Sequence, residues 1–220
     1  MPDRSTPTDD TRRSYDAVAE RYAAEVSYEL AGKPLDRALL DAFAELAADG
    51  PVLDVGCGPG HTAGRLAGRG VTAFGLDLSP GMCAVARAAT SLPYAVADMT
   101  ALPVRTGAAA GVLCLYAVIH LDEPRRAAAY AEFARVLRPG GHALVAFHNS
   151  SAEVRTGQEV TASDWWGHPV ALTFRYLDPV AETTALAGAG LQVTARLDRA
   201  PQPGVEHQSR RSYLLARRAG

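Results

Sequence analysis

A glycine-rich turn directly after a short apolar segment constrains the fold of this chain most strongly. The segment reads Val52-Leu53-Asp54-Val55-Gly56-Cys57-Gly58-Pro59-Gly60, and a helical pattern begins at about His61. Because glycine has no Cβ, it can adopt positive φ angles and let a ligand approach the backbone closely. The helix behind the turn directs unpaired N–H groups and a partial positive charge toward that ligand. The segment therefore predicts the first strand–turn–helix of a nucleotide-cofactor site.

The spacing of the glycines distinguishes between classes of cofactor. Dinucleotide sites use G-x-G-x-x-G, with an acidic residue about 20 positions further on. Here the glycines are Gly56, Gly58 and Gly60, and His61 stands where the third dinucleotide glycine is required. Asp54 precedes the turn, and a carboxylate at its lip would repel a diphosphate but not a cofactor that carries an ammonium and a sulfonium. The turn therefore favours a cationic cofactor over a nicotinamide dinucleotide.

The segment VLDVGCGPG resembles the first motif of class I S-adenosylmethionine-dependent methyltransferases. Further motifs follow in the order of that family, and together they cover about residues 12 to 148. Val71–Ser79 matches a second strand that ends in Asp77, and Tyr94–Met99 matches a third strand that ends in Asp98. Leu113–Tyr116 matches the end of a fourth strand, and Val136–Gly141 matches the turn before a fifth.

The resemblance implies S-adenosyl-L-methionine as cofactor and S-adenosyl-L-homocysteine as product. Asp77 would accept hydrogen bonds from the ribose hydroxyls, and Asp98 would bind the adenine amine. Tyr15 and Tyr22 share one face of an N-terminal helix that would cover the cofactor, although two core tyrosines are an alternative. The expected cofactor-binding residues are Tyr15, Tyr22, Asp54, Gly56, Cys57, Gly58, Gly60, Asp77, Leu78, Met82, Asp98, Met99, Leu115, Tyr116 and His120.

Alternating strand and helix patterns predict an α/β fold of the Rossmann-like, doubly wound type, with helices on both faces of the sheet. By resemblance the sheet has about seven strands and is mostly parallel, and its last two strands form a hairpin that adds one antiparallel strand. The strands are expected at 51–55, 71–77, 93–97, 110–116, 142–148, near 190–198 and at 210–217, and the helices at 12–30, 34–48, 61–69, 80–89, 123–137 and 178–188.

The chain is expected to form a single methyltransferase domain over residues 12–220. Residues 1–11 are polar, contain Pro and Asp, and are expected to be a flexible tail. Residues 12–48 would form an N-terminal helical cap. Residues 149–177 break the alternation of strands and helices with aromatic, Gly and Pro residues, and are expected to be an irregular insertion on the substrate side.

Ligands of open α/β sheets bind at the carboxyl ends of the strands, which places the chemistry near residues 116–120 and 148–176. Methyl transfer by in-line displacement mainly requires positioning, and sometimes removal of a proton. The candidates for this proton transfer are His120 and His148, whose side-chain type titrates near neutral pH. The alternatives are that His120 packs beside the cofactor or bonds to the backbone, and that His148 orders the following loop.

Aromatic side chains of the insertion can form the wall of an acceptor pocket. The alternative for the Trp165–Trp166 pair is that at least one ring anchors the loop to the sheet. The expected substrate-side residues are Tyr116, His148, Trp165, Trp166 and Phe174.

Composition and missing motifs argue against several classes of function. The formal charge of −2 leaves no basic footprint for nucleic acid, and no apolar run is long enough to span a membrane. The three dispersed cysteines indicate reduced thiols and a cytoplasmic protein. The acid-rich ligand set of metal-dependent relatives is missing, so no metal is expected. Strand four ends in Leu115-Tyr116-Ala117 rather than Asp/Asn-Pro-Pro-Tyr/Phe, which disfavours nucleobase nitrogens as acceptors.

These observations predict a methyltransferase that acts on an O, N or C atom of a small organic molecule, as a monomer or homodimer. The Ala, Arg and Gly usage resembles that of a GC-rich bacterial gene and suggests a role in bacterial specialised metabolism. Three alternatives remain open: a protein or RNA methyltransferase, which requires the arginines at 210, 211, 217 and 218 to cluster; a non-catalytic S-adenosylmethionine-binding protein; and a nicotinamide oxidoreductase.

Overall fold

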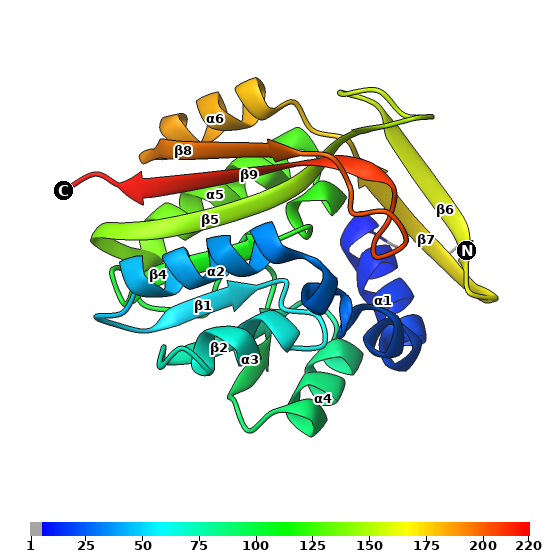
Figure 1. Ribbon diagram of the computed structural model, residues 1–220, viewed down its shortest axis with the longest axis horizontal. Coiled ribbons are helices and arrows are strands. Elements are labelled where there is room, and N and C mark those ends of the chain that lie inside the picture. Colours follow the sequence, from blue (N-terminus) through cyan, green and yellow to red (C-terminus); the bar gives the residue numbers. More distant parts are fainter. Residues whose placement is uncertain (1–5) are drawn as a thin grey trace.

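A seven-stranded sheet forms the centre of the molecule (Figure 1). The structure is a computed structural model and describes residues 6–220. The strand order is β3-β2-β1-β4-β5-β9-β8, so the chain reverses its direction of travel across the sheet between β1 and β4. The strands are β1 Val52–Val55, β2 Ala73–Asp77, β3 Tyr94–Val96, β4 Ala109–Leu115, β5 Leu137–Ser151, β8 Leu191–Arg199 and β9 Ser209–Arg218.

All of these strands are parallel except β9, which lies antiparallel between β5 and β8. A short loop joins β8 to β9, and two strands joined in this way pair antiparallel, whereas parallel neighbours need a longer crossover. The expectation of a mostly parallel, doubly wound sheet with one antiparallel strand is confirmed.

Helices cover both faces of the sheet because side chains alternate along each strand. Leu53 and Val55 of β1 pack in the same apolar cluster as Tyr130 and Phe133 of α5, whereas Val52 packs in the cluster on the opposite face. Helices α2, α3 and α4 contribute to that second cluster. The helices are α1 Pro7–Val26, η1 Glu29–Gly32, α2 Pro34–Leu46, α3 His61–Ala67, α4 Pro80–Ala89, η2 Val118–His120, α5 Glu123–Val136 and α6 Pro179–Gly188.

Helix α1 begins earlier than the sequence analysis predicts. The expected tail over residues 1–11 is wrong for residues 7–11, which are helical. The Thr6 side chain accepts a hydrogen bond from the Asp9 backbone N–H, the Asp9 side chain bonds back to Thr6, and Pro7 occupies the first turn. This reciprocal cap satisfies N–H groups that a helix leaves unpaired at its start. Residues 1–5, also part of the expected tail, lie outside the described residues.

The segment 149–177, expected to be irregular, contains a two-stranded antiparallel sheet. Strands β6 Glu159–Trp165 and β7 His168–Arg175 pair with each other and not with the central sheet. Trp166 and Gly167 form the loop and have φ angles of 55° and 79°. Two successive positive φ angles are typical of a type I′ hairpin turn, for which Asn-Gly is the usual signal, so Trp-Gly did not predict it. Figure 1 shows this hairpin beside α1, beyond the carboxyl ends of the parallel strands.

Within residues 6–220, no helix is both long and apolar enough to cross a membrane.

Candidate functional site

A cavity lies where the carboxyl ends of β1, β2 and β4 meet helix α1. Its volume is about 90 Å³. Most of the residues expected to bind the cofactor line it, although they come from distant parts of the chain. They are Tyr15, Tyr22, Gly56, Gly58, Asp77, Leu78, Met82, Asp98, Met99, Leu115, Tyr116 and His120. The expected residues that do not line it are Asp54, Cys57 and Gly60.

The glycines of the turn have positive φ angles but different surroundings. A Cβ at Gly56 would lie 2.3 Å from the Cβ of Ala117, and one at Gly60 would lie 2.4 Å from the Tyr94 hydroxyl. A Cβ at Gly58 would meet only Tyr22, at 3.9 Å. Gly56 and Gly60 are therefore required by the packing of the protein itself, whereas Gly58 leaves open space beside the cavity. That space is the close backbone approach that a cofactor needs.

Asp77 ends β2 and forms part of the cavity wall. Its two carboxylate oxygens accept hydrogen bonds from the backbone N–H groups of Gly58 and Ser79, both at 2.8 Å. Burial raises the pKa of Asp77, and these two hydrogen bonds oppose the increase. The carboxylate therefore holds the glycine turn against the start of α4, and it faces the cavity with acceptor capacity left for a diol.

Asp54 does not face the cavity, contrary to the expectation from the sequence. It is 1% exposed, and it accepts a hydrogen bond from the Thr62 hydroxyl at 2.6 Å. The backbone N–H of Ala63 is a further donor. A buried carboxyl group requires such donors, and the first turn of α3 supplies them. Burial raises the pKa of Asp54 to about 7. In this structure Asp54 therefore supports the turn from behind.

Cys57 and Gly60 also lie outside the cavity for reasons of packing. Cys57 is buried with its thiol toward the Gly58 carbonyl oxygen, 3.7 Å away, and burial raises the pKa of the thiol. Gly60 has φ of 81° at the start of α3 and packs against Tyr94.

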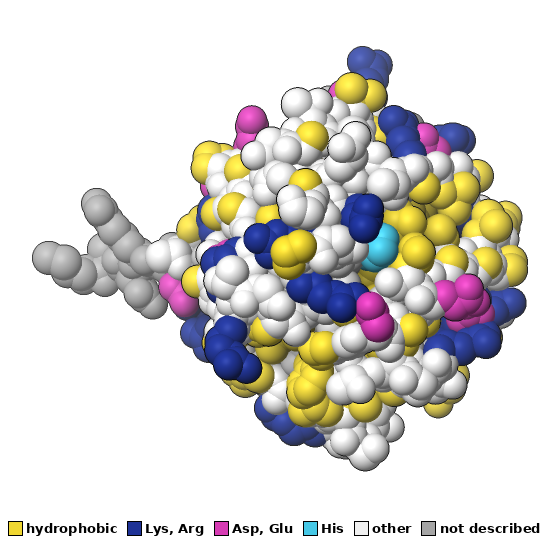
Figure 2. All heavy atoms as spheres, turned by 90° about the vertical axis from the view of Figure 1, so that its left-hand side faces the viewer, with side chains coloured by type: hydrophobic (Ala, Val, Ile, Leu, Met, Phe, Trp, Pro, Cys, Tyr) yellow, Lys and Arg dark blue, Asp and Glu magenta, His cyan; other side chains and the backbone are white. Residues whose placement is uncertain are grey.

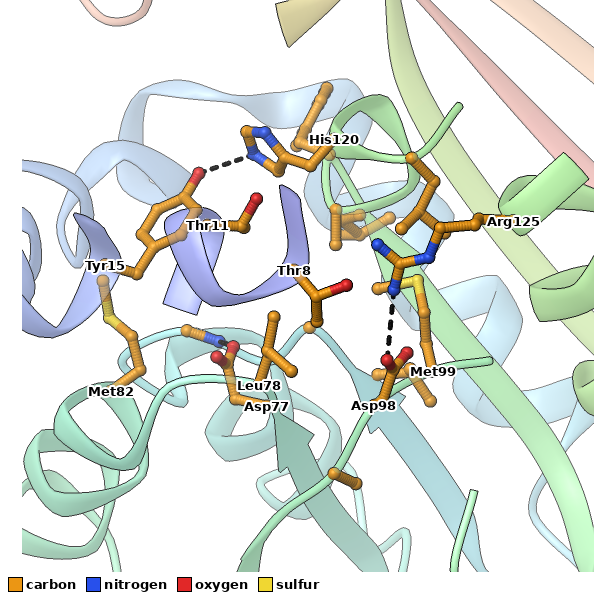
Figure 3. A pocket seen from close by; sticks show the side chains of 18 of the residues that line it. Thr8, Thr11, Tyr15, Asp77, Leu78, Met82, Asp98, Met99, His120 and Arg125 are labelled. Atoms are coloured by element: carbon orange, nitrogen blue, oxygen red, sulfur yellow. Dashed lines mark hydrogen bonds and ion pairs between the residues drawn. The ribbon is translucent and has the colours of Figure 1, made fainter. Parts of the chain in front are cut away.

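Asp98 lines the cavity on the side of Arg125 (Figure 3). One carboxylate oxygen accepts from the backbone and the hydroxyl of Thr100, at 2.9 and 2.8 Å, and the other pairs with Arg125 at 3.1 Å. Arg125 belongs to α5 and lines the cavity, but sequence reasoning missed it. Nothing in the local sequence distinguishes Arg125 from an arginine on the protein surface.

Helix α1 forms one wall of the cavity. Thr8 and Thr11 belong to the first turns of this helix and line the cavity, and Figure 3 shows Thr8 projecting toward Asp77 and Asp98. Sequence reasoning missed both threonines because they fall in the expected tail. The Thr6-Pro7 capping signal would have placed them on the helix.

Hydrogen bonds of Asp16 and Ser14 hold α1 in this position. Asp16 accepts hydrogen bonds from the Ser79 hydroxyl at 2.6 Å and the Gly81 N–H at 2.8 Å, at the start of α4. The Ser14 hydroxyl accepts from the Ala171 N–H of β7 at 2.9 Å. Helix α1 is therefore held against the start of α4 through Asp16 and against the hairpin through Ser14.

His120 connects the end of β4 to α1 and to β7. Its Nδ1 lies 2.9 Å from the Thr173 carbonyl oxygen, and its Nε2 lies 2.7 Å from the Tyr15 hydroxyl. A carbonyl oxygen only accepts, so Nδ1 carries the proton and Nε2 accepts from Tyr15. Burial lowers the pKa of His120 to about 4, which keeps the imidazole neutral at pH 7.

His148 lies near the site but does not line the cavity. Its ring stacks on Tyr116 with 5.0 Å between centroids, and its Nδ1 lies 2.6 Å from the Ser209 hydroxyl. Burial and the nearby Arg211 guanidinium lower its pKa well below the usual value. Tyr116 has a φ of 58°, which is unusual for a residue with a side chain, and its hydroxyl bonds to that of Tyr213. His148 therefore supports the ring of Tyr116.

The tryptophans and Phe174 pack around the tyrosines of α1 instead of lining the cavity. The Trp165 ring lies 6.1 Å from Tyr15 and 5.6 Å from Tyr22, in edge-to-face contact. Trp166 stacks on Trp165 at 4.7 Å, and Phe174 lies 5.0 Å from the ring of His120. Neither tryptophan lines this cavity, and a role of either ring in an acceptor pocket stays a prediction.

Within residues 6–220, no group of three or more His, Cys, Asp or Glu side chains is arranged to hold a metal ion.

Comparison with known proteins agrees with this geometry. A family described as "Methyltransferase domain" matches residues 52–141, from β1 to the start of β5. The malonyl-[acyl-carrier protein] O-methyltransferase of Hahella chejuensis is 37% identical over 58% of this chain and 48% of that protein. The chain contains a methyltransferase domain, matched over residues 52–141.

Other matches to this methyltransferase domain bear different names. The mouse tRNA (carboxymethyluridine(34)-5-O)-methyltransferase ALKBH8 is 26% identical over 73% of this chain and 26% of that protein. A solved structure of the [4+2]-cyclase SpnF superposes with a TM-score of 0.71 at 18% identity, covering 98% of this chain and 97% of that chain. The chain spans about half or less of the length of the first curated relatives. The cyclase shows the fold alone, and a fold does not define a reaction.

Proposed function

We propose that the protein transfers the methyl group of S-adenosyl-L-methionine to an O, N or C atom of a small organic acceptor. One observation carries this proposal: a single cavity is lined by the backbone of Gly58, by Asp77 at the end of β2 and by Asp98 beyond β3. The Asp77 carboxylate beside the turn suits a diol and a cationic group rather than a diphosphate. The methyltransferase domain matched over residues 52–141 supports the same assignment.

In the proposed complex, Asp77 would hold the ribose hydroxyls, while Asp98 and Met99 would lie along the adenine. S-adenosyl-L-methionine, when bound, supplies an electrophilic methyl group on a sulfonium. The protein then has to exclude water and orient the acceptor. Helix α1 and the β6–β7 hairpin serve this purpose as parts of the same domain, since Thr8, Thr11 and Tyr15 cover the cavity.

We propose that His120 is the residue that contacts the acceptor. Its neutral Nε2 accepts a hydrogen bond from Tyr15, and the Thr173 carbonyl fixes the tautomer that leaves Nε2 free of a proton. An acceptor that takes the place of the Tyr15 hydroxyl would donate its own proton to the same atom. His148 would act through Tyr116, because its ring stacks on that residue outside the cavity.

A small acceptor is favoured over RNA or protein by the covering helix and by the arginines. Arg211 is 3% exposed and donates to the Ser209 and His207 carbonyl oxygens, so it is not available at the surface. Arg210 and Arg217 lie seven residues apart on β9, about 23 Å at the rise of an extended strand. On the face that carries the C-terminus, basic side chains are scattered among acidic and apolar ones (Figure 2). The required cluster does not form.

The test is calorimetric titration of the purified protein with S-adenosyl-L-homocysteine and, separately, with NADH. We expect binding of the first and not of the second, since His61 occupies the position of the third dinucleotide glycine. Asp77→Asn should weaken S-adenosyl-L-homocysteine binding by about tenfold or more, because hydrogen bonds to a charged group contribute about 1.5–3 kcal/mol. The exposed Glu20→Gln is the matched control. Equal affinity in wild type and Asp77→Asn would overturn the ribose assignment.

Turnover separates the catalytic proposal from a non-catalytic one. The test panel contains acceptors with a hydroxyl, carboxyl or amine group or a nucleophilic carbon atom, and the readout is release of S-adenosyl-L-homocysteine. We expect multiple turnovers with at least one of these classes. Binding of the cofactor without turnover on any member would favour a regulatory or purely binding protein. Release that requires RNA, and falls steeply with salt, would favour the RNA alternative.

A further inference from the structure

A second cleft lies on the face of the sheet covered by α2 and α3, away from the cavity already described. It has a volume of about 420 Å³ and is formed by the segment after α1, the start of α2 and one side of α3. Three arginines and one histidine line it: Arg37, Arg65, Arg69 and His61. Of the described residues that line this basic cleft, none is acidic. No residue of the basic cleft lines the first cavity.

The charges of the three arginines are only partly balanced. Asp41, which does not itself line the cleft, accepts two hydrogen bonds from Arg65 at 2.7 and 2.9 Å and a further one from Arg69. Arg37 donates to the carbonyl oxygens of Leu30 and Ala31, which carry no charge. Three guanidinium groups thus converge with one carboxylate among them. Their mutual repulsion favours binding of an anion between them.

Two buried nitrogen atoms of the basic cleft have no hydrogen-bond partner among the described residues. They are Nε of Arg65 and Nδ1 of His61. An arginine Nε–H can only donate, and a buried donor without an acceptor is costly. His61 can present Nδ1 as a donor in one of its neutral tautomers. Both atoms are buried, so they leave unmet hydrogen-bonding capacity close to the cleft without being exposed in it.

We propose that the basic cleft binds a phosphate group, as the free ion or as a phosphomonoester. A phosphate offers several acceptor oxygens around two negative charges, and guanidinium groups bind it with charge-assisted hydrogen bonds. Arg37, Arg65 and Arg69 supply the guanidinium donors, and His61 lies beside them in the lining of the cleft. This site is separate from the cofactor cavity and does not depend on the function proposed above.

The cleft also adjoins the parts of the chain that form the cofactor cavity. Ser27 lines it directly after α1, and His61 follows the glycine turn at Gly60. A phosphate held between them would join the end of α1 to α3. Because no residue is shared between the two sites, phosphate and S-adenosyl-L-homocysteine should bind at the same time.

The experiment is calorimetric titration of the full chain with inorganic phosphate at constant ionic strength, with chloride as the compensating anion. The test variant carries Arg37→Gln and Arg69→Gln. The control carries Arg105→Gln and Arg155→Gln, which remove the same charge from exposed positions outside both cavities. We expect saturable binding to wild type and control, and affinity lower by about tenfold or more in the test variant.

Two results would overturn the site: no saturable binding to wild type, or equal affinity in the test and control variants. A titration with glycerol 3-phosphate in place of inorganic phosphate distinguishes a phosphomonoester from the free phosphate ion as the ligand. Tighter binding of the ester indicates a phosphomonoester as ligand, and equal or weaker binding indicates the free ion. Titration of every variant with S-adenosyl-L-homocysteine shows that the protein is folded and keeps this test independent of the cofactor assignment.

Discussion

The Tyr15 hydroxyl lies 2.7 Å from Nε2 of His120, 105 positions further along the chain. This hydrogen bond joins the helix that covers the cofactor cavity to the residue that follows β4. Since Nδ1 of the same ring bonds to the Thr173 carbonyl oxygen, one imidazole links α1, the central sheet and the hairpin. The His120 imidazole therefore holds α1 over the cavity through Nε2 and keeps its own proton on Nδ1.

Tyr15→Phe should loosen this closure without disturbing the core. The variant keeps the ring contacts with Tyr22 and Trp165 and loses only the hydroxyl. A hydrogen bond contributes about 0.5–1.5 kcal/mol net, so we expect affinity for S-adenosyl-L-homocysteine to fall by about threefold to tenfold in calorimetry. Tyr28→Phe, at an 81% exposed tyrosine, is the control and should bind as wild type does. Unchanged affinity in Tyr15→Phe would show that the bond does not contribute to closure.

Gly58→Val should abolish cofactor binding in a folded protein. The new side chain would fill the open space beside Asp77, where only Tyr22 lies within 4 Å. The positive φ of 52° adds backbone strain, so the control must carry the same strain elsewhere. Gly107→Val fits, because Gly107 has φ of 70° and no neighbour within 4 Å. Both variants should melt at similar temperatures, but only Gly107→Val should bind S-adenosyl-L-homocysteine; binding by Gly58→Val would make the turn purely structural.

Acidification should destabilise the protein partly through His120. Its pKa is about 4 in the folded state and near 6.5 in the unfolded state, so between these values the unfolded chain binds more protons. The contribution of His120 to stability is therefore complete above pH 6.5 and is lost as pH falls toward 4, up to about 3 kcal/mol.

His120→Gln should accordingly show a smaller loss of unfolding free energy between pH 7 and pH 4.5 than wild type in urea denaturation. Asp54, whose pKa is raised to about 7, changes stability in the opposite direction, but its effect is common to both proteins and cancels in the comparison. His168→Gln, at an exposed hairpin position, serves as control. Parallel pH profiles for wild type and His120→Gln would contradict the assignment of a depressed pKa.

The two tryptophans of the hairpin should differ in their effect on stability. Trp165 contacts Tyr15, Tyr22 and Phe174, whereas Trp166 is 38% exposed and stacks mainly on Trp165. Trp165→Ala should lower the unfolding free energy by about 2 kcal/mol or more, since a large aromatic contact area is lost. Trp166→Ala should cost about 1 kcal/mol or less. The reverse order in urea denaturation would show that the hairpin is held by other contacts.

Local patterns were sufficient to predict the fold because each element carries its own signal. The glycine turn, the Ser79-Pro80 cap of α4 and the apolar run of β4 each report a backbone preference or a burial requirement within a few residues. For the same reason the acids at the ends of β2 and β3 were predicted at the edge of the sheet where the cavity lies. The start of α1 was missed although the Thr6 cap is also local, because a polar, proline-containing terminus was interpreted by composition alone.

Tertiary structure decided the features that depend on distant partners. The direction of the Asp54 carboxylate depends on Thr62 and Ala63, and the tautomer of His120 on Thr173. The role of Trp165 depends on α1, which is separated from it by most of the chain. Side-chain orientation and protonation follow from the donors, acceptors and burial around each group. Sequence by itself determined which segments form strands, turns and helices, and only the packed structure determined which of their polar atoms face the cavity.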